Sequence, residues 1–119
     1  MTLAPGRQPH VDHPDYPSGV VVEIARIAVQ PGLEDQFLAA YPEAHQILAG
    51  SPGFLSGRIT RGVESPSLFV LIIERESVEA HLKNFAETER FTRFAALLMP
   101  FLAGQPEVGH FVDVPTVAD

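Results

Sequence analysis

The spacing of apolar residues along the chain predicts four strands and two helical regions. Runs rich in β-branched and aromatic residues predict strands at residues 20–29, 54–62, 68–75 and 107–114. Apolar residues recur at helical spacing over residues 33–50, and again over residues 77–102 with an interruption near Thr88. The order β-α-β-β-α-β is the split βαβ arrangement of ferredoxin-like domains, so we expect an α+β fold with an antiparallel sheet.

Capping residues and prolines refine the two helical regions. Ser77 is a good N-cap residue, and Glu79 lies in the first turn after it, where the helix dipole favours a negative charge. Pro42 lies inside the first helical region, where it removes a backbone donor and predicts a kink or a loosened turn. We therefore expect the second helical region to begin at Ser77 and the first to be distorted near its middle.

The strand predicted at 68–75 is apolar on both faces. Alternate residues point to opposite sides, with Leu68, Val70 and Ile72 on one side and Phe69, Leu71 and Ile73 on the other. Two helices can cover only one face of an antiparallel sheet, so the second face needs another cover. A second copy packed sheet against sheet in a twofold homodimer supplies it most simply. The alternative is that the N-terminal segment folds back over this face.

The ends of the chain are expected to lie outside the folded domain. Residues 1–19 contain four prolines and little that could pack, which predicts an extended N-terminal arm. The domain is expected to span residues 20–114, followed by a C-terminal tail at 115–119. His10 and His13 of the arm could be ligands of a metal ion. Binding a metal would, however, have to order a flexible segment, and the loss of conformational entropy opposes this. We expect no metal site.

Composition removes several classes of function. The chain has 119 residues, enough for one domain, and a net charge of −7 with few Lys and Arg residues, so we expect no nucleic-acid partner. It has no cysteine, which excludes disulfides, thiolate catalysis and Cys-ligated metals. The N-terminus lacks the apolar core of a signal peptide, and no apolar run reaches membrane length. A cytoplasmic protein with no membrane partner is expected.

Three stretches together resemble the antibiotic biosynthesis monooxygenase family: ARIAVQPGLEDQFLAAY, GFLSGRITRGVESPSLFVLIIERESVEAH and FTRFAALLMPFLAGQPEVGHF. The resemblance covers roughly residues 20 to 112 and implies a dimeric α+β barrel. It also implies a choice of activities, because the family and its relatives include cofactor-free oxygenases of aromatic polyketides, heme-degrading enzymes and small-molecule isomerases. Heme-degrading members resemble one another in an Asn, Trp and His set. This chain has no tryptophan, carries Arg75 at the strand end and has Asn84 where their helical His would fall, which argues against heme chemistry.

The oxygenase activity implied by the resemblance requires little from the protein. An electron-rich phenolate or carbanion can pass an electron directly to molecular oxygen, so the protein must supply an apolar pocket, a base and donors for the oxyanion. No metal, flavin or nucleotide motif is present, and we expect no cofactor. His81 is the expected base, since its imidazole titrates near neutral pH and should lie at the rim of the second helix. A surface histidine that only covers the first helical turn is the alternative.

Arg75 is the expected partner of the oxyanion if its strand face looks toward the helices. Otherwise it would pair with Glu74, Glu76 or Asp113 at the strand end. His110 is interpreted as a sheet histidine at a dimer contact. The other side chains expected to contact a small aromatic substrate are Tyr41, His45, Phe69, Phe85 and Phe94. The alternative is that they belong to the core, since phenylalanines at this spacing are more often core residues, and that His45 packs against the sheet edge.

Three functions remain open from the sequence. The first is a cofactor-independent monooxygenase that oxidises an aromatic, polyketide-like small molecule. The second is another small-molecule enzyme on the same scaffold, such as an isomerase or cyclase that uses the same base. The third is a non-catalytic dimeric binding module. An open cavity that reaches His81 favours either enzyme, and a filled helix–sheet core favours the binding module.

Overall fold

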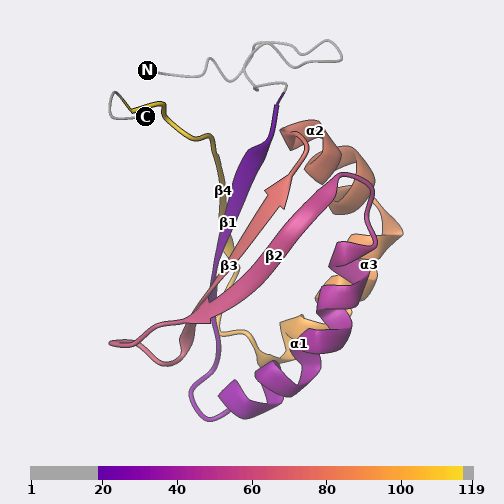
Figure 1. Ribbon diagram of the computed structural model, residues 1–119. Helices are drawn as coiled ribbons and strands as arrows, with labels where there is room; N and C mark the ends of the chain where they lie inside the picture. Colours follow the sequence, from indigo (N-terminus) through magenta and orange to yellow (C-terminus); the bar gives the residue numbers. More distant parts are fainter. Residues whose placement is uncertain (1–18, 117–119) are drawn as a thin grey trace.

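The computed structural model describes residues 19–116, and the elements follow the order predicted from the sequence (Figure 1). The strands are β1 (Val21–Ala28), β2 (Phe54–Arg61), β3 (Leu68–Arg75) and β4 (Glu107–Phe111). The helices are α1 (Glu34–Ala49), α2 (Val78–His81) and α3 (Glu89–Leu98), with a π-helical turn at Leu82–Ala86 and a 3₁₀ turn at Met99–Phe101. The predicted arm and the end of the predicted tail fall on residues 1–18 and 117–119, outside this described part.

The four strands form one antiparallel sheet in the order β2-β3-β1-β4. The helices lie together on one face of this sheet (Figure 1). The α+β ferredoxin-like fold expected from the sequence is therefore confirmed. Strand β4 ends at Phe111, three residues earlier than predicted, where its pairing with β1 ends at Val22.

Helix α1 continues through Pro42 for 16 residues. The helix buries one stripe, Phe37, Tyr41, Ala44 and Leu48, against the sheet, as the apolar spacing predicts. Phe37 meets Phe69 of β3 with ring centroids 4.8 Å apart. Packing of this apolar stripe outweighs the backbone hydrogen bond that Pro42 cannot donate.

The second helical region is divided where the sequence predicted. The Ser77 hydroxyl accepts a hydrogen bond from Ala80 N at 3.0 Å and caps α2, and the Thr88 hydroxyl accepts one from Arg90 N at 3.2 Å and caps α3. The turn before β2 holds the start of α2, because Glu76 N donates to Gly53 O at 2.8 Å. Gly53 has a φ of 92°, and a Cβ there would lie 2.5 Å from Ala80 Cβ. This close approach fixes the position of α2 over the end of the sheet.

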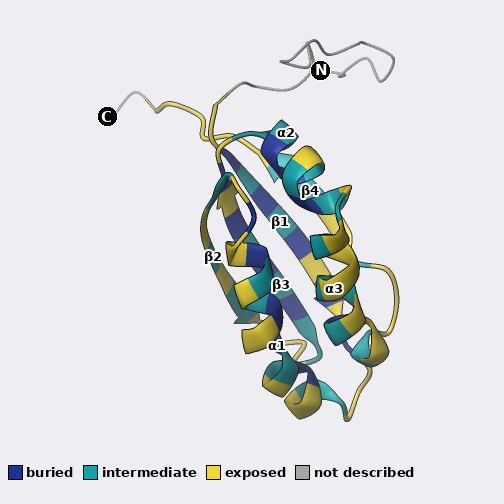
Figure 2. Cartoon of the chain, turned by 90° about the vertical axis from the view of Figure 1, so that its right-hand side faces the viewer, coloured by how far each residue is buried: buried dark blue, intermediate teal, exposed yellow. Residues whose placement is uncertain are grey.

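The two faces of the sheet have different surroundings. The inward residues of β1 and β3 are buried beneath the helices (Figure 2). On the opposite face, which we call the outer face, Val22, Ile24, Val70 and Ile72 are only half-buried, and Phe111 is 54% exposed. None of the elements in residues 19–116 covers the outer face, as expected from the two-sided apolar pattern. In the same stretch, no helix is both long and apolar enough to cross a membrane.

Candidate functional site

A cavity of about 210 Å³ lies between the sheet and the helices. Most of its lining is apolar or aromatic, including Ile27, Leu48, Leu71, Phe85 and Phe94. Three further lining residues, Phe91, Gln105 and Val108, are exposed and mark the side on which the cavity opens to solvent, between α3 and β4. Glu23 and His81 are the polar, titratable members of the lining. The helix–sheet core is therefore not completely filled, and the cavity reaches His81.

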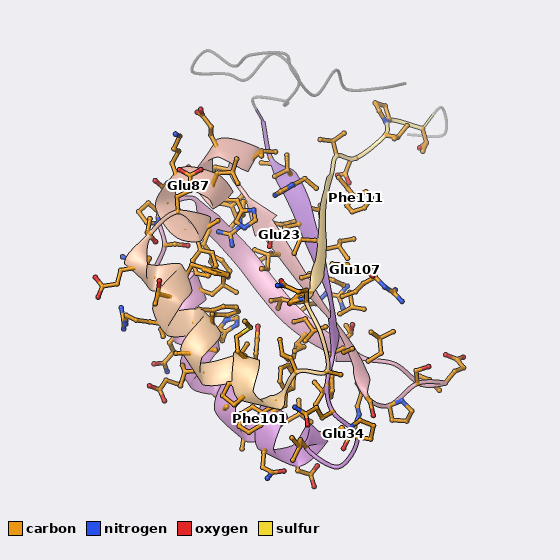
Figure 3. The ribbon with its side chains drawn as sticks, turned by 180° about the vertical axis from the view of Figure 1, so that it is seen from behind. Glu23, Glu34, Glu87, Phe101, Glu107 and Phe111 are labelled. Atoms are coloured by element: carbon orange, nitrogen blue, oxygen red, sulfur yellow. The ribbon has the colours of Figure 1, made fainter. Side chains whose placement is uncertain are left out.

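Glu23 and Arg75 form a buried ion pair beside this cavity. Both residues point inward from neighbouring strands, Glu23 from β1 and Arg75 from β3, and Arg75 Nε donates to Glu23 Oε1 at 2.7 Å. Glu23 is 5% exposed and Arg75 is fully buried. Figure 3 shows Glu23 among the side chains between the helices and the sheet. Arg75 thus faces the helices, and its partner is Glu23 rather than the strand-end carboxylates suggested by the sequence.

The two terminal nitrogens of Arg75 are buried without a hydrogen-bond partner among the described residues. The guanidinium carbon lies 5.1 Å from the Phe85 ring centroid, so the ring face supplies a cation–π contact but no acceptor. A buried donor left without an acceptor costs free energy, because it has lost its contacts with water. Arg75 does not itself line the cavity, but it contacts two residues that do, Glu23 and Phe85.

His81 connects the ion pair to the edge strand β4. Its Nε2 lies 3.4 Å from Glu23 Oε2, and its Nδ1 shares a 2.7 Å hydrogen bond with His110 Nε2. The π-helical turn begins directly after His81 and places Phe85 so that the two rings stack with centroids 6.3 Å apart. π-helical turns are rare and are often found at functional sites. In the sheet register, His110 lies directly opposite Glu23, so the fold itself brings these side chains together.

Both histidines are neutral at pH 7 in this arrangement. Burial lowers the pKa of His81 to about 3, and the positive charge of Arg75 and the neighbouring His110 add to the effect. Burial also lowers the pKa of His110, and this effect exceeds the opposing influence of the Glu23 carboxylate. The prediction that His81 titrates near neutral pH at the rim of the helix was wrong, because the π-helical turn and β4 bury it to 8% exposure. His110 points to the helix side, away from the outer face expected to form a dimer contact.

The remaining residues predicted for the site divide into two groups. Phe85 and Phe94 line the cavity. Phe69 packs against α1, and Tyr41 shares a 3.1 Å hydrogen bond with His45 on the side of the core nearer β2. Burial raises the pKa of Tyr41 to about 12, so its hydroxyl stays protonated. Phe69, Tyr41 and His45 do not line the cavity described above, and their contact with a substrate stays a prediction.

Glu23 is the charged residue lining this cavity, and it was not singled out from the sequence. A signal was present, because Glu23 interrupts the inward-facing positions Val21, Ala25 and Ile27 of a strand that is otherwise apolar on that side. A carboxylate at such a position must find a partner in the core. The strand register then identifies Arg75 and His110 as the residues within reach.

Comparisons with known proteins agree with the fold and its topology. The family model described as antibiotic biosynthesis monooxygenase matches residues 20–97. The uncharacterized protein YczJ of Bacillus subtilis is 30% identical over 95 residues, which cover 80% of this chain and all of YczJ. The match to the family model ends before β4, so it contains Glu23, Arg75 and His81 but not His110.

Solved structures give the same result. A candidate antibiotic biosynthesis monooxygenase from Bordetella bronchiseptica is 30% identical, with a TM-score of 0.78 over 82% of this chain and 99% of that one. SnoaB, a cofactor-independent oxygenase from Streptomyces nogalater, is 20% identical, with a TM-score of 0.72 over 85% of this chain and 99% of that one, and at this identity it shows a shared fold only. With its matched domain and its superposable relatives, the chain belongs to the antibiotic biosynthesis monooxygenase family.

Proposed function

We propose that this protein is a cofactor-independent monooxygenase that oxidises a small, electron-rich aromatic molecule in the cavity between the sheet and the helices. The observation that carries the proposal is an aromatic-lined cavity in which the lining residue Glu23 is paired with Arg75, a buried cation whose terminal nitrogens have no partner among residues 19–116. The fold of SnoaB, which is described as a cofactor-independent oxygenase, is compatible with this chemistry.

The polar end of the cavity provides the groups that the reaction needs. Removing a proton from a phenol or an activated C–H group makes an electron-rich anion, which can transfer an electron to molecular oxygen. Glu23 and His81 both line this end of the cavity, where the Glu23 carboxylate can take the substrate proton and His81 lies beside it. Arg75 does not line the cavity, but its positive charge lies next to the lining residues Glu23 and Phe85 and favours the negative charge that develops on the substrate oxygen.

The size of the cavity limits the part of a substrate that it can enclose. An apolar protein cavity of about 150 Å³ holds a benzene molecule. At about 210 Å³, the present cavity accommodates one ring or a fused pair of rings. A larger, polyketide-like molecule would place one end in the cavity and extend past the exposed rim at Phe91 and Val108. We therefore assign the enclosed portion of the substrate as a one- or two-ring phenol.

Oxygen consumption tests this proposal directly. The purified full-length chain is mixed with 1-naphthol in the presence of a metal chelator, and dissolved oxygen is followed with an electrode. The expected result is oxygen uptake that is lost in Ala25→Phe, which fills the cavity, and kept in Ala96→Phe, a matched change on the exposed side of α3. Full uptake by Ala25→Phe would contradict the proposed site, and full turnover by His81→Ala would remove His81 from the proton transfer.

The same assay separates the other functions. An isomerase or cyclase on this scaffold would change the probe without consuming oxygen. A non-catalytic binding module would bind 1-naphthol, seen as a change in its fluorescence, and return it unchanged. Either result would replace the monooxygenase proposal.

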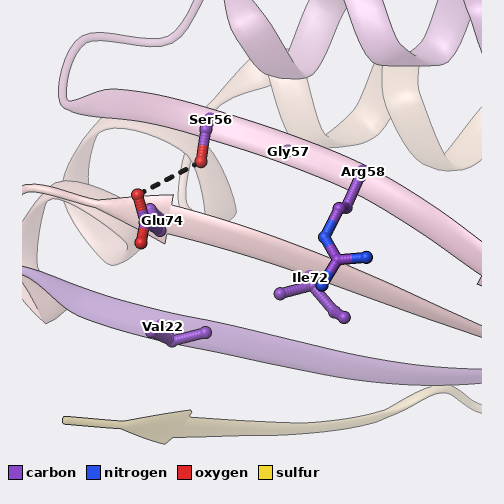
Figure 4. A pocket seen from close by; sticks show the side chains of 6 residues that line it. All are labelled: Val22, Ser56, Gly57, Arg58, Ile72 and Glu74. Atoms are coloured by element: carbon purple, nitrogen blue, oxygen red, sulfur yellow. Dashed lines mark hydrogen bonds between the residues drawn. The ribbon is translucent and has the colours of Figure 1, made fainter. Parts of the chain in front are cut away.

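We further propose that a second copy of the chain covers the outer face and completes a dimeric barrel. The half-buried apolar residues Val22 and Ile72 support this proposal, and they line a shallow hollow of about 320 Å³ together with Arg58 and Glu74 (Figure 4). Glu74 accepts a 3.3 Å hydrogen bond from Ser56 at one end of the hollow. An apolar centre with polar groups at its edge is the usual composition of a surface that binds a protein.

A further inference from the structure

Arg75, Glu23, His81 and His110 form an unbroken series of contacts from the buried core to the edge of the sheet. Arg75 Nε contacts Glu23 Oε1 at 2.7 Å, Glu23 Oε2 lies 3.4 Å from His81 Nε2, and His81 Nδ1 lies 2.7 Å from His110 Nε2. His110 is partly exposed on β4, the last strand of the sheet. The series therefore begins at a fully buried cation and ends next to solvent.

The chemistry of the groups fixes the position of each proton in this series. Arg75 Nε can only donate, and a carboxylate can only accept. His81 Nε2 lies 3.4 Å from a carboxylate oxygen, beyond the usual length of a hydrogen bond, but an unprotonated nitrogen would turn its lone pair toward that negative charge. We therefore place the proton on Nε2, and because the ring is neutral its Nδ1 is then the acceptor. His110 Nε2 must consequently donate to His81 Nδ1, which leaves His110 Nδ1 without a proton. The Arg75 charge thus sets the tautomers of two histidines through Glu23.

Both ring nitrogens of His81 are occupied by these contacts, and neither is free to take a proton from a molecule in the cavity. Glu23 is different. Its carboxylate lines the cavity and has more acceptor sites than its contacts with Arg75 and His81 use. We infer that Glu23 is the group that exchanges a proton with the substrate, and that His81 and His110 form a relay connecting Glu23 to solvent at the β4 edge. The assignment of a substrate proton rests on the proposed function; the relay itself does not.

Transfer through the relay moves one proton and no electrons. A proton from solvent forms an N–H bond at His110 Nδ1, and the N–H bond at His110 Nε2 breaks as one forms at His81 Nδ1. The N–H bond at His81 Nε2 then breaks as an O–H bond forms at Glu23 Oε2. Glu23 is now a carboxylic acid that can donate its proton to an oxyanion in the cavity, and both rings carry their protons on Nδ1. A proton that Glu23 next takes from a substrate can then pass to His81 Nε2, from His81 Nδ1 to His110 Nε2, and from His110 Nδ1 to solvent, which restores the starting tautomers.

Nitrogen-15 NMR of the histidine rings in the full-length chain at pH 7 tests the relay without any substrate. The expected spectrum has His81 and His110 both protonated at Nε2, with resonances assigned by histidine-to-glutamine variants. In Glu23→Gln, the amide oxygen must accept from Arg75 Nε, so the amide NH₂ faces His81 Nε2. Both tautomers should therefore reverse to the Nδ1-protonated form.

Two controls make this result specific. Glu74→Gln is the matched change on the outer face of β3 and should leave both tautomers unchanged. His45, which bonds only with Tyr41 among the hydrogen bonds described, should keep its tautomer in every variant. A wild-type His81 protonated at Nδ1, or unchanged tautomers in a folded Glu23→Gln variant, would overturn the relay.

Turnover provides the second test and separates the relay from the proposed function. His110→Gln can still donate an amide hydrogen bond to His81 but cannot pass a proton, so oxygen uptake with 1-naphthol should fall and then recover when imidazole is added. Glu23→Gln should lose about a hundredfold or more in rate, the usual contribution of a general acid or base. Uptake that is unchanged in both variants refutes the relay and leaves the oxygenase standing. The expected tautomers without any uptake support the relay and refute the oxygenase.

Discussion

Glu23→Leu should destabilise the protein strongly, because it removes the carboxylate that Arg75 Nε contacts. Arg75 is 0% exposed, and an arginine in a protein cannot give up its proton, so the variant would bury a charge without a counterion. Breaking a buried ion pair in this way costs about 3–5 kcal/mol. The total stability of a domain is about 5–15 kcal/mol, so this single change would remove from about a fifth of the stability to all of it.

The partner variant should be milder. In Arg75→Met, the Glu23 carboxyl can bind a proton, or His81 at 3.4 Å can bind one and become its counterion. Both responses neutralise the buried charge. In the double variant Glu23→Leu/Arg75→Met no ion remains, and well-packed apolar replacements of buried ion pairs are often neutral or stabilising by about 1–4 kcal/mol. We therefore expect the double variant to be the most stable of the three, Arg75→Met to be intermediate and Glu23→Leu to be the least stable.

Urea unfolding at pH 7, followed by circular dichroism, measures these differences. Glu87→Leu is the control, since Glu87 makes an ion pair of 3.8 Å with Lys83 in which both side chains are more than half exposed. The control should change stability by less than about 1 kcal/mol. The reasoning fails if Glu23→Leu unfolds within about 1 kcal/mol of the wild type, or if the two single changes add in the double variant.

Three further outcomes follow from the structure. Ile72→Asp on the outer face should shift the protein from dimer to monomer in analytical ultracentrifugation. Val63→Asp is the control and should not, since Val63 is 87% exposed in the β2–β3 hairpin. A wild-type protein that is monomeric at micromolar concentration would refute the dimeric barrel. The pKa of His81 is lowered to about 3, so the unfolded chain binds a proton that the folded chain does not. The free energy of unfolding should therefore fall as the pH drops from about 6.5 toward 3, by up to about 1.4 kcal/mol per pH unit. In urea titrations His81→Gln should reduce this dependence on pH. An equal dependence in the variant and the wild type would contradict a buried, neutral His81 ring. Gly53→Ala should lower the melting temperature, because an alanine is strained at a φ of 92° and its Cβ would lie 2.5 Å from the Ala80 side chain of α2. Gly104→Ala is the control, since a Cβ there meets no atom within 4 Å, and it should melt like the wild type.

The fold was predictable because each element carries its own local signal. Ser77 and Thr88 cap the helices where the periodicity changes, and the two-sided apolar strand at 68–75 forecast the uncovered outer face. These features depend on neighbours close in the sequence. His81 and Arg75 could be proposed as site residues in the same way, because each was identified from its own residue type and from its place at the end of a strand or the start of a helix.

The state of the site could not be predicted, because it depends on neighbours that are distant in the sequence. The burial of His81 comes from His110, 29 residues further on, and from a π-helical turn that a 3.6-residue period does not reveal. The partner of Arg75 is 52 residues away, and only the β1–β3 register brings it within reach. The alternation of residues along the strand correctly placed His110 on the same side as Val108. The sequence did not show which face of the sheet this side is, because that depends on how β4 pairs with β1.

Strand β4 joins the sheet through β1 alone, yet it supplies both Val108 at the mouth of the cavity and His110 beside it. Because β4 pairs only with β1, substitutions in this five-residue strand do not touch the pairing of β2 with β3 or of β3 with β1. Libraries that vary this strand while keeping His110 would alter which molecules can enter the cavity. They would leave Glu23, Arg75 and His81 unchanged. On one edge strand, Val108 borders the opening of the cavity and His110 belongs to the proposed relay.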